Sequence, residues 1–350
     1  GMSIFTGYIQ FMNECKSIPR RGGTPLRAEY HIVFTTKEYA ELIPFEQEKK
    51  ELDPEEVAGK TIMSLISPGT EIAIYKGNGN FSFPINPGYA AIFQVEAIGE
   101  NVKDIKAGDY VFCMDNHKSY IKLPRKDVLP LPKGLKPEIA LFARLAAVSM
   151  TTLVTTRSRP PQKVLINGLG IIGHLAAQIF QSCGYDVIGC DSGANRRELA
   201  LRKGIKKVIQ SLNDPELVGK IALVLECRGN EQDVLTECKM VCQGGEIVLV
   251  GVPWEQRANL SAHELLNAVF YNYAIIRSGW EWELPTYSQK SEQLSVYDNI
   301  KRAMRWLAEG RINIDGLYNK VSPIDAQTIY QNILNRKSNY LTSIFDWTLI

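Results

Sequence analysis

One seven-residue segment constrains the fold of this chain more than any other: Asn167-Gly-Leu-Gly-Ile-Ile-Gly173. It follows an apolar segment, Lys163–Ile166, that is typical of a buried strand, and it opens a segment with apolar residues at helical spacing. In such a strand–turn–helix unit the first glycine allows a tight turn, the second admits a pyrophosphate, and the third lets the helix pack on the strand. The helix N-terminus then attracts phosphate. The predicted contacts of a dinucleotide in this segment are Gly168, Gly170, Ile171 and Gly173.

An acidic residue stands at the distance that this interpretation requires. Asp191 ends the next predicted strand, Asp186–Cys190, and lies 23 residues beyond Gly168. A carboxylate there accepts hydrogen bonds from the adenosine ribose and repels a 2′-phosphate, which favours NAD(H) over NADP(H). Arg196 and Arg197 follow closely. They either soften this preference, with Arg196 as a cofactor contact, or form the solvated first turn of a helix.

Strand and helix patterns alternate from residue 163 to about residue 283. Such alternation predicts a parallel sheet covered by helices on both faces, with ligands at the carboxyl ends of its strands. Cys227 and Gly229 follow one predicted strand end, and Gly251 and Val252 follow another. We therefore expect these four residues at the cofactor site.

The remainder of the chain has a different pattern. Before about residue 150, short apolar runs are separated by turns rich in Gly, Pro and Asn, which predicts a β-rich domain. After about residue 284, two helices and an apolar, β-prone segment, Leu341–Trp347, no longer follow the alternation. We expect this tail to return to the first domain. The predicted boundaries are 1–148 with 284–350 for one domain and 149–283 for the Rossmann domain.

Composition and charge exclude several classes of protein. The chain has 350 residues, and its 40 Lys and Arg nearly balance 38 Asp and Glu, for a formal charge of +2. This balance gives no electrostatic basis for a nucleic-acid or anionic-membrane partner. The most apolar stretch, Ile139–Val154, carries Arg144 and is too short to span a bilayer. The 7 scattered cysteines indicate reduced thiols and a cytoplasmic location.

Several fragments, taken in order, resemble the medium-chain dehydrogenase/reductase superfamily, which includes the alcohol dehydrogenases. Besides the glycine motif, Asp191 and Gly251, they are Ser64–Glu71, Pro87–Ala90, Val95–Gly99, Gly108–Val111, Leu129–Gly134 and Gly310–Ile314. The resemblance covers nearly the whole chain. It implies an α/β fold in which a doubly wound Rossmann domain is inserted into a GroES-like β-rich catalytic domain. It also places Ile172 and Val252 near the nicotinamide.

The chain departs from this family at the zinc ligands. Pro68 stands where zinc-dependent members have Cys, Tyr89 and Ala90 replace His-Glu, and no Cys, Asp or Glu lies near Arg144, where a further ligand is expected. The four-cysteine structural-zinc lobe is also missing. A catalytic zinc needs about three protein ligands, so we expect none here. The alternative is a rebuilt site that uses Cys113 and His117.

Three residues are candidates for proton transfer. Thr70 occupies the family's relay hydroxyl, although the relay histidine is replaced by Ala73. Tyr89 is expected in the cleft, where its phenol either hydrogen-bonds a carbonyl or only fills space. His117 falls where the family's strand approaches the nicotinamide, and it is the histidine best placed by sequence for acid–base chemistry.

The preferred hypothesis is a zinc-independent NAD(P)(H)-dependent oxidoreductase acting on a carbonyl or alcohol, an enone or a quinone. The alternatives are a zinc-dependent alcohol or polyol dehydrogenase with rearranged ligands, and a non-catalytic nucleotide-binding redox sensor. The alternating Trp and Glu of Gly279–Pro285 suit a polyhydroxylated substrate, but the preferred interpretation is a dimer-edge strand with its Trp rings buried at the interface. We expect a small-molecule substrate and a homodimer or homotetramer.

Overall fold

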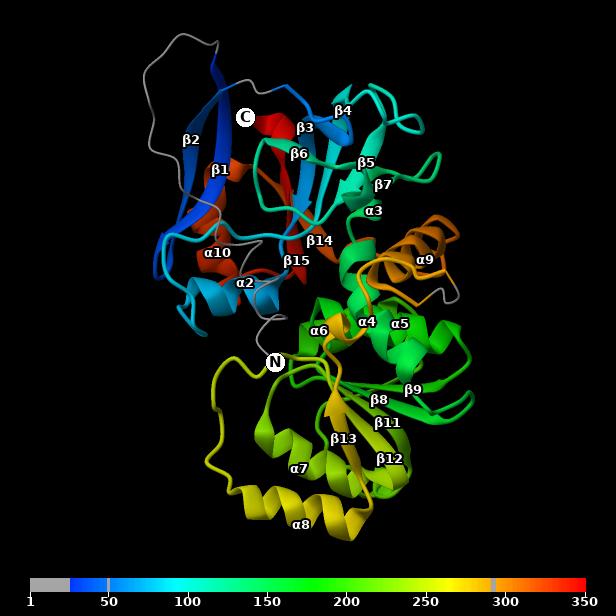
Figure 1. The fold of residues 1–350 in the computed structure, drawn as a ribbon. Helices are drawn as coiled ribbons and strands as arrows, with labels where there is room; N and C mark the ends of the chain where they lie inside the picture. Colours follow the sequence, from blue (N-terminus) through cyan, green and yellow to red (C-terminus); the bar gives the residue numbers. More distant parts are fainter. Residues whose placement is uncertain (1–25, 49–50, 291–293) are drawn as a thin grey trace. The chain divides into compact units, whose positions relative to one another are not determined.

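The computed structural model describes residues 26–48, 51–290 and 294–350 of the chain (Figure 1). The chain divides into two compact units. Unit 1 contains residues 1–141 and 318–350, and unit 2 contains residues 142–317. The first has the β-rich GroES-like arrangement and the second the Rossmann arrangement, so the predicted α/β fold class is confirmed.

Unit 1 is built on a seven-stranded sheet with the order β14-β15-β3-β4-β5-β7, in which β6 also pairs with β3. Its strands are β3 (Glu56–Leu65), β4 (Ala91–Ile98), β5 (Tyr110–Cys113), β6 (Tyr120–Pro124), β7 (Val128–Pro130), β14 (Tyr318–Val321) and β15 (Thr342–Asp346). A separate antiparallel hairpin is formed by β1 (Leu26–Thr36) and β2 (Tyr39–Glu48). The helices are α2 (Pro68–Tyr75), α3 (Pro137–Ala140) and α10 (Ala326–Leu334).

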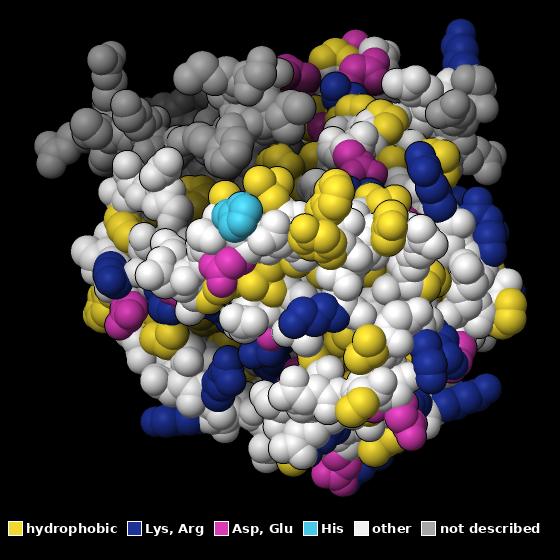
Figure 2. Space-filling view, turned by 90° about the horizontal axis from the view of Figure 1, so that it is seen from below, with side chains coloured by type: hydrophobic (Ala, Val, Ile, Leu, Met, Phe, Trp, Pro, Cys, Tyr) yellow, Lys and Arg dark blue, Asp and Glu magenta, His cyan; other side chains and the backbone are white. Residues whose placement is uncertain are grey.

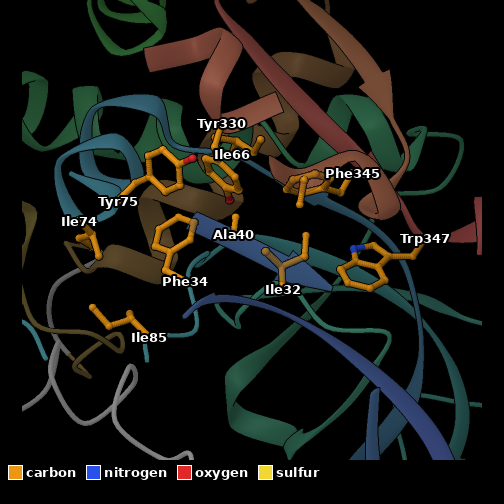
Figure 3. Packing of buried hydrophobic residues seen from close by; sticks show 11 residues of the cluster. Ile32, Phe34, Ala40, Ile66, Ile74, Tyr75, Ile85, Tyr330, Phe345 and Trp347 are labelled. Atoms are coloured by element: carbon orange, nitrogen blue, oxygen red, sulfur yellow. The ribbon is translucent and has the colours of Figure 1, made fainter. Parts of the chain in front are cut away.

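The core of unit 1 joins residues from both ends of the chain. Figure 3 shows Phe34 from β1, Tyr75 from α2 and Tyr330 from α10 pointing toward one another. The ring of Phe34 meets that of Tyr330 edge-on at 4.8 Å, and Tyr75 stacks on Tyr330 at 5.5 Å. Aromatic pairs with this geometry stabilise a core beyond the area they bury. The predicted return of the C-terminal segment to the first domain therefore holds from Tyr318 onward.

Unit 2 is a six-stranded parallel sheet with the order β10-β9-β8-β11-β12-β13. The strands are β8 (Lys163–Asn167), β9 (Asp186–Cys190), β10 (Lys207–Ile209), β11 (Ile221–Glu226), β12 (Val241–Leu249) and β13 (Ile275–Ser278). The helices are α4 (Ala143–Thr155), α5 (Ile171–Ser182), α6 (Ala194–Arg202), α7 (Glu231–Met240), α8 (Ala262–Asn272) and α9 (Val296–Ala308). In Figure 1, α5 and α6 lie above the sheet while α7 and α8 lie below it. The strand order reverses between β8 and β11, where such sheets bind ligands.

The boundary between the units differs from the predicted one. Residues 284–317 were expected with the β-rich domain, but they belong to unit 2 together with residues 142–148. The reason is helix α9, which buries Ile300, Met304 and Leu307 and packs against α4. A helix that adds to the edge of a Rossmann domain without a following strand breaks the strand–helix alternation from which the boundary was inferred.

The segment Pro137–Thr155 is apolar and long enough to cross a membrane by length and composition. It is divided into α3 and α4, and 67% of its most apolar window is buried inside the structure. Helix α4 packs against α5 and α9. Its apolar character is therefore that of a core helix.

Candidate functional site

The turn between β8 and α5 has the geometry that the glycine motif predicts. Gly168 has a φ of 97°, which a side chain rarely adopts. A Cβ on Gly173 would lie 1.7 Å from the carbonyl oxygen of Gly168, so no side chain fits there. Gly170 is the N-cap of α5, and Ile171 and Ile172 form its first turn. The helix N-terminus thus stands directly over the strand end, as phosphate binding requires.

Asp191 joins this turn to the next one. Its side chain is almost fully buried, and Oδ2 accepts a hydrogen bond from the Leu169 N–H at 2.9 Å. Oδ1 accepts from the Gly193 N–H at 2.7 Å. A carboxylate has about four acceptor positions, so these two bonds leave capacity for two ribose hydroxyls.

The two arginines after Asp191 lie in different surroundings. Arg197 donates to the carbonyl oxygens of Asp191 and Ser192, at 2.9 and 2.8 Å, so it stabilises the β9–α6 loop. Arg196 approaches the Asp191 carboxylate at 3.6 Å and lies over Gly170. Of the two, only Arg196 is beside the glycine turn, which agrees with its selection as a cofactor contact.

A cavity of about 490 Å³ opens beside these loops. Its wall is formed by Asn167, Cys190, Ser192, Gln210, Ser211, Leu212, Asn213, Arg228, Gln232, Asp233 and Thr236. The loops after β11 and β12 meet close by: a Cβ on Gly251 would lie 2.6 Å from the backbone of Cys227, and one on Gly229 would lie 2.8 Å from the carbonyl oxygen of Val252. The structure therefore gathers the predicted cofactor residues at the carboxyl edge of one sheet.

Sequence reasoning missed a group of carboxyls beneath these loops. Glu226 ends β11 and is fully buried, and its two oxygens accept the N–H groups of Arg228 and Gly229, at 3.0 and 2.7 Å. Burial raises the pKa of Glu226 to about 6, against the effect of these hydrogen bonds. Burial also raises the pKa of Glu237 well above its usual range, and the neighbouring Glu226 adds to the effect. A Glu at the end of an otherwise apolar strand was the available signal.

In unit 1, His117 is the centre of a buried polar network. Its Nε2 lies 2.7 Å from Glu71 Oε1, and its Nδ1 lies 2.7 Å from Ser64 Oγ. The hydroxyl of Tyr330 donates to the same Glu71 oxygen at 2.7 Å, and the Trp347 indole donates to Ser64 at 2.9 Å. Burial raises the pKa of the Tyr330 phenol well above its usual range. The network fastens the C-terminal segment to β3 and α2.

His117 does not lie at the position that the sequence predicted. The prediction placed its imidazole at a cleft, but the ring is fully buried and both nitrogens have protein partners. Gly88 covers the ring, because a Cβ there would lie 2.7 Å from it. This burial argues against direct proton exchange with a substrate and in favour of a structural role.

Tyr89 and Thr70 are more accessible. Tyr89 is half-buried, and its hydroxyl donates to Ser67 Oγ. Ser67 precedes α2, and its backbone N–H donates to Glu71 Oε2 at 2.5 Å. Thr70 lies in the first turn of α2 and is partly exposed. Tyr89 is thus connected through Ser67 to the network that contains His117.

The residues present do not fit a zinc ion. Pro68 begins α2 and has no donor atom for a metal. Cys113 is buried in β5, and burial raises the pKa of its thiol well above the usual range, which opposes the thiolate that zinc requires. Within residues 26–48, 51–290 and 294–350, no group of three or more His, Cys, Asp or Glu side chains could hold a metal.

Arg144 has an anionic partner that the sequence did not reveal. Its guanidinium forms a bidentate pair with Glu281, at 2.7 and 2.6 Å, and both side chains are buried. The ring of Trp282 lies 6.0 Å from the same guanidinium. The pair fastens α4 to the segment after β13 within unit 2. Glu281 is therefore engaged by Arg144, and this weakens the interpretation of Gly279–Pro285 as a substrate-binding segment.

Comparisons with known proteins agree with this geometry. A family model described as zinc-binding dehydrogenase matches residues 172–281. Galactitol-1-phosphate dehydrogenase from Escherichia coli has a similar structure, with a TM-score of 0.77 at 19% identity over 91% of this chain and 99% of that one. A zinc-binding dehydrogenase from Sinorhizobium meliloti bound to NADP gives 0.74 at 17% identity, with coverage of 91% and 99%.

Together these comparisons support a relationship to the medium-chain dehydrogenase/reductase superfamily. Alcohol dehydrogenase of Geobacillus stearothermophilus is 25% identical over 208 residues, which cover 49% of this chain and 61% of that protein. L-galactonate-5-dehydrogenase of Escherichia coli is 25% identical over 310 residues, which cover 77% and 86%. The aligned part spans less than two thirds of the alcohol dehydrogenase.

The buried network of unit 1 predicts a large effect of Glu71→Gln. The amide cannot serve His117, Tyr330 and the Ser67 N–H together, and breaking a buried charged interaction costs about 3–5 kcal/mol of unfolding free energy. The matched variant Glu96→Gln changes an exposed carboxylate of strand β4 in the same unit and should cost about 0.5 kcal/mol or less. Urea unfolding measures both. Equal losses in the two variants would contradict the assigned role of the network.

Proposed function

We propose that this chain is an NAD(P)(H)-dependent oxidoreductase that works without zinc. The observation that carries the proposal is the convergence of the β8–α5 turn, Asp191 and the Cys227–Gly229 loop at one sheet edge. When bound, the nicotinamide accepts or supplies a hydride. Gly168, Gly170 and Gly173 with the start of α5 would hold the pyrophosphate, Asp191 and Arg196 the adenosine ribose, and Gly251 and Val252 the nicotinamide end.

The proposed cofactor preference is NAD(H). Asp191 offers two free acceptor positions to ribose hydroxyls and a negative charge against a 2′-phosphate. Arg196 lies 3.6 Å from that carboxylate and offsets part of its charge. Its guanidinium is also within reach of the glycine turn. NADP(H) is therefore bound less tightly in this proposal but is not rejected.

The proposed substrate is a carbonyl or alcohol, an enone or a quinone. Without a Lewis acid, the developing negative charge on a substrate oxygen needs hydrogen-bond donors. Tyr89 and Thr70 are the hydroxyl donors of unit 1 at the positions that the family resemblance assigns to substrate chemistry. His117, which is buried behind Gly88, would act on Tyr89 only through Glu71 and Ser67.

The proposed assembly is a homodimer, and the proposed location is the cytoplasm. Helix α8 buries none of its side chains, although Leu266, Phe270 and Tyr271 are 67%, 74% and 74% exposed. Figure 2 shows hydrophobic side chains gathered on the face of the molecule seen from below. Strand β13 lies at the edge of the described sheet, and its Ile275 is 39% exposed. The described cysteines are all free thiols, which suits a reducing compartment.

The cofactor proposal predicts that NADH binds more tightly than NADPH, by about tenfold or more for roughly 1.4 kcal/mol of repulsion by Asp191. Asp191→Ser should narrow or invert this ratio, because the carboxylate is removed. Isothermal titration of both nucleotides measures it. Tighter NADPH binding by the parent chain would refute the assignment of Asp191, and binding of neither would refute the proposed function.

The zinc proposal predicts no stoichiometric metal and no loss of activity with chelators. Elemental analysis of the purified chain measures the first, and an NADH-dependent assay on a quinone and enone panel measures the second. About one zinc per chain would instead favour the dehydrogenase with rearranged ligands. Nucleotide binding with no turnover on any carbonyl would favour the redox sensor.

The proton-donor proposal predicts different effects for substitutions at Tyr89 and at His117. Tyr89→Phe retains the ring and should lower turnover by about 10²–10⁴-fold with nucleotide affinity unchanged. The main effect of His117→Ala should be a lower free energy of unfolding, with a smaller effect on turnover, because the imidazole is buried. Steady-state kinetics with thermal unfolding distinguishes the two. Normal turnover of Tyr89→Phe on every accepted substrate would leave proton delivery to Thr70 or solvent.

The assembly proposal predicts a dimer of about 79 kDa, twice the 39.3 kDa chain. Phe270→Lys should weaken it, because a charge would enter an apolar contact in both copies. Leu201→Lys changes an exposed leucine of α6 and should not. Sedimentation equilibrium measures both, and a monomeric parent would contradict the proposal.

A further inference from the structure

Three carboxyl groups in unit 2 share one amide. The side-chain nitrogen of Asn167 lies 2.9 Å from Glu237 Oε1, 3.1 Å from Asp233 Oδ2 and 3.5 Å from Glu226 Oε1. An amide carries only two N–H groups, so it cannot serve three acceptors fully. Glu226 and Glu237 are both fully buried. We call these three acidic residues, with Asn167, the carboxyl cluster.

The charges around the carboxyl cluster do not balance. The one cation in contact with it among the described residues is Arg228, whose guanidinium lies 2.7 Å from Asp233. The other titratable neighbours carry negative charge or none: Asp191, Cys190 and Cys227. Buried like charges cannot all ionise, so the cluster holds a proton. Glu237 Oε2 is buried without a hydrogen-bond partner, which leaves it as a place for that proton.

The cluster also shapes the loops assigned to the cofactor. The Glu226 carboxylate accepts the N–H groups of Arg228 and Gly229, and its main-chain oxygen accepts that of Gly251 at 2.8 Å. Asn167 directly precedes Gly168. A Cβ on Gly168 would lie only 2.8 Å from the Cγ atom of Arg228. Glu226 thus connects both sides of the nucleotide-binding edge.

The same cluster borders the cavity of about 490 Å³, because Asn167, Arg228 and Asp233 form part of its wall. A dinucleotide bound at this edge would exclude water from the wall and bring two phosphate charges near it. Both effects disfavour an ionised carboxylate. Water exclusion and the phosphate charges therefore both raise the pKa of the carboxyl cluster and favour its protonated form.

We propose that Glu226 is a positioning residue for the cofactor loops and that the carboxyl cluster takes up a proton when the dinucleotide binds. The proposal rests on the proposed function, since it needs a dinucleotide at this edge. It assigns a role in regulation by pH to three carboxyls that contact no reacting atom.

The sign of the pH dependence follows from the linkage of binding to protonation. A ligand that favours the protonated cluster binds best when the proton is already present. Affinity should therefore be greatest at low pH, where the cluster is already protonated, and fall as the pH rises toward the higher pKa of the cluster in the complex. A shift of one unit in that pKa corresponds to about a tenfold fall in affinity.

Titration calorimetry of the full chain with NAD⁺ at pH 6.5 tests the proposal. Two buffers with different ionisation enthalpies, phosphate and Tris, give the number of protons taken up per nucleotide. We expect about 0.3–1 proton for the parent. Glu237→Gln, which resembles the protonated side chain, should reduce this number by about half or more while retaining affinity at pH 6. Glu226→Gln should also weaken binding, because an amide nitrogen cannot accept a loop N–H.

Glu231→Gln is the matched control, because Glu231 begins the same helix as a half-buried carboxylate whose pKa is held below its usual range, chiefly by its own backbone N–H. It should leave proton uptake unchanged. Binding with no proton uptake by the parent overturns the inference, and so does equal uptake in the parent and Glu237→Gln. Proton uptake by the parent chain is measured without any variant, so the inference stays testable even where a variant does not fold. Absence of NAD⁺ binding at every pH would instead refute the proposed function.

Discussion

The nucleotide-binding edge depends on one close approach, between Gly173 and the carbonyl oxygen of Gly168. Because a Cβ would lie 1.7 Å from that oxygen, only glycine lets α5 begin on the end of β8. The turn is then fixed by neighbouring strands: the Gly168 N–H donates to Cys190 at 2.8 Å, and the Cys227 N–H donates to Asn167 at 2.9 Å. Three strand ends are thereby placed in register, and the cavity and carboxyl cluster form around them.

Local structure could be predicted from the sequence where one periodic signal decided it. Strand β9 has the predicted bounds, Asp186–Cys190, because a buried parallel strand appears in the sequence as a short apolar run. The placement of α9 could not be predicted, because an apolar helix face does not itself identify the element that it packs against. Pairs distant in sequence were also hidden: Arg144 and Glu281 are 137 residues apart, and Glu71 and Tyr330 are 259 apart.

The two units differ in how completely their buried carboxyl groups are hydrogen-bonded. In unit 1 each oxygen of Glu71 has a partner, His117 and Tyr330 for one and the Ser67 N–H for the other. A satisfied network of this kind makes one arrangement of a core unique. In unit 2 three carboxyls share one amide and one cation, so a proton is needed to balance them. Incomplete satisfaction of buried polar groups calls for an explanation, and under the proposed function the explanation is the dinucleotide that binds beside them.

The satisfied network also explains how a site without zinc ligands could still polarise a substrate oxygen. Tyr89 donates to Ser67, a neutral hydroxyl, and such a bond contributes about 0.5–1.5 kcal/mol. A bond from the same phenol to a negatively charged oxygen is worth about 1.5–3 kcal/mol. Under the proposed function, Tyr89 would exchange the weaker acceptor for the stronger one as charge develops. That difference stabilises the transition state and not the bound ground state, which is the condition for faster turnover. Glu71 makes this exchange of acceptors possible. It accepts the backbone N–H of Ser67 and so holds Ser67 in place when the Ser67 hydroxyl loses its hydrogen bond from Tyr89.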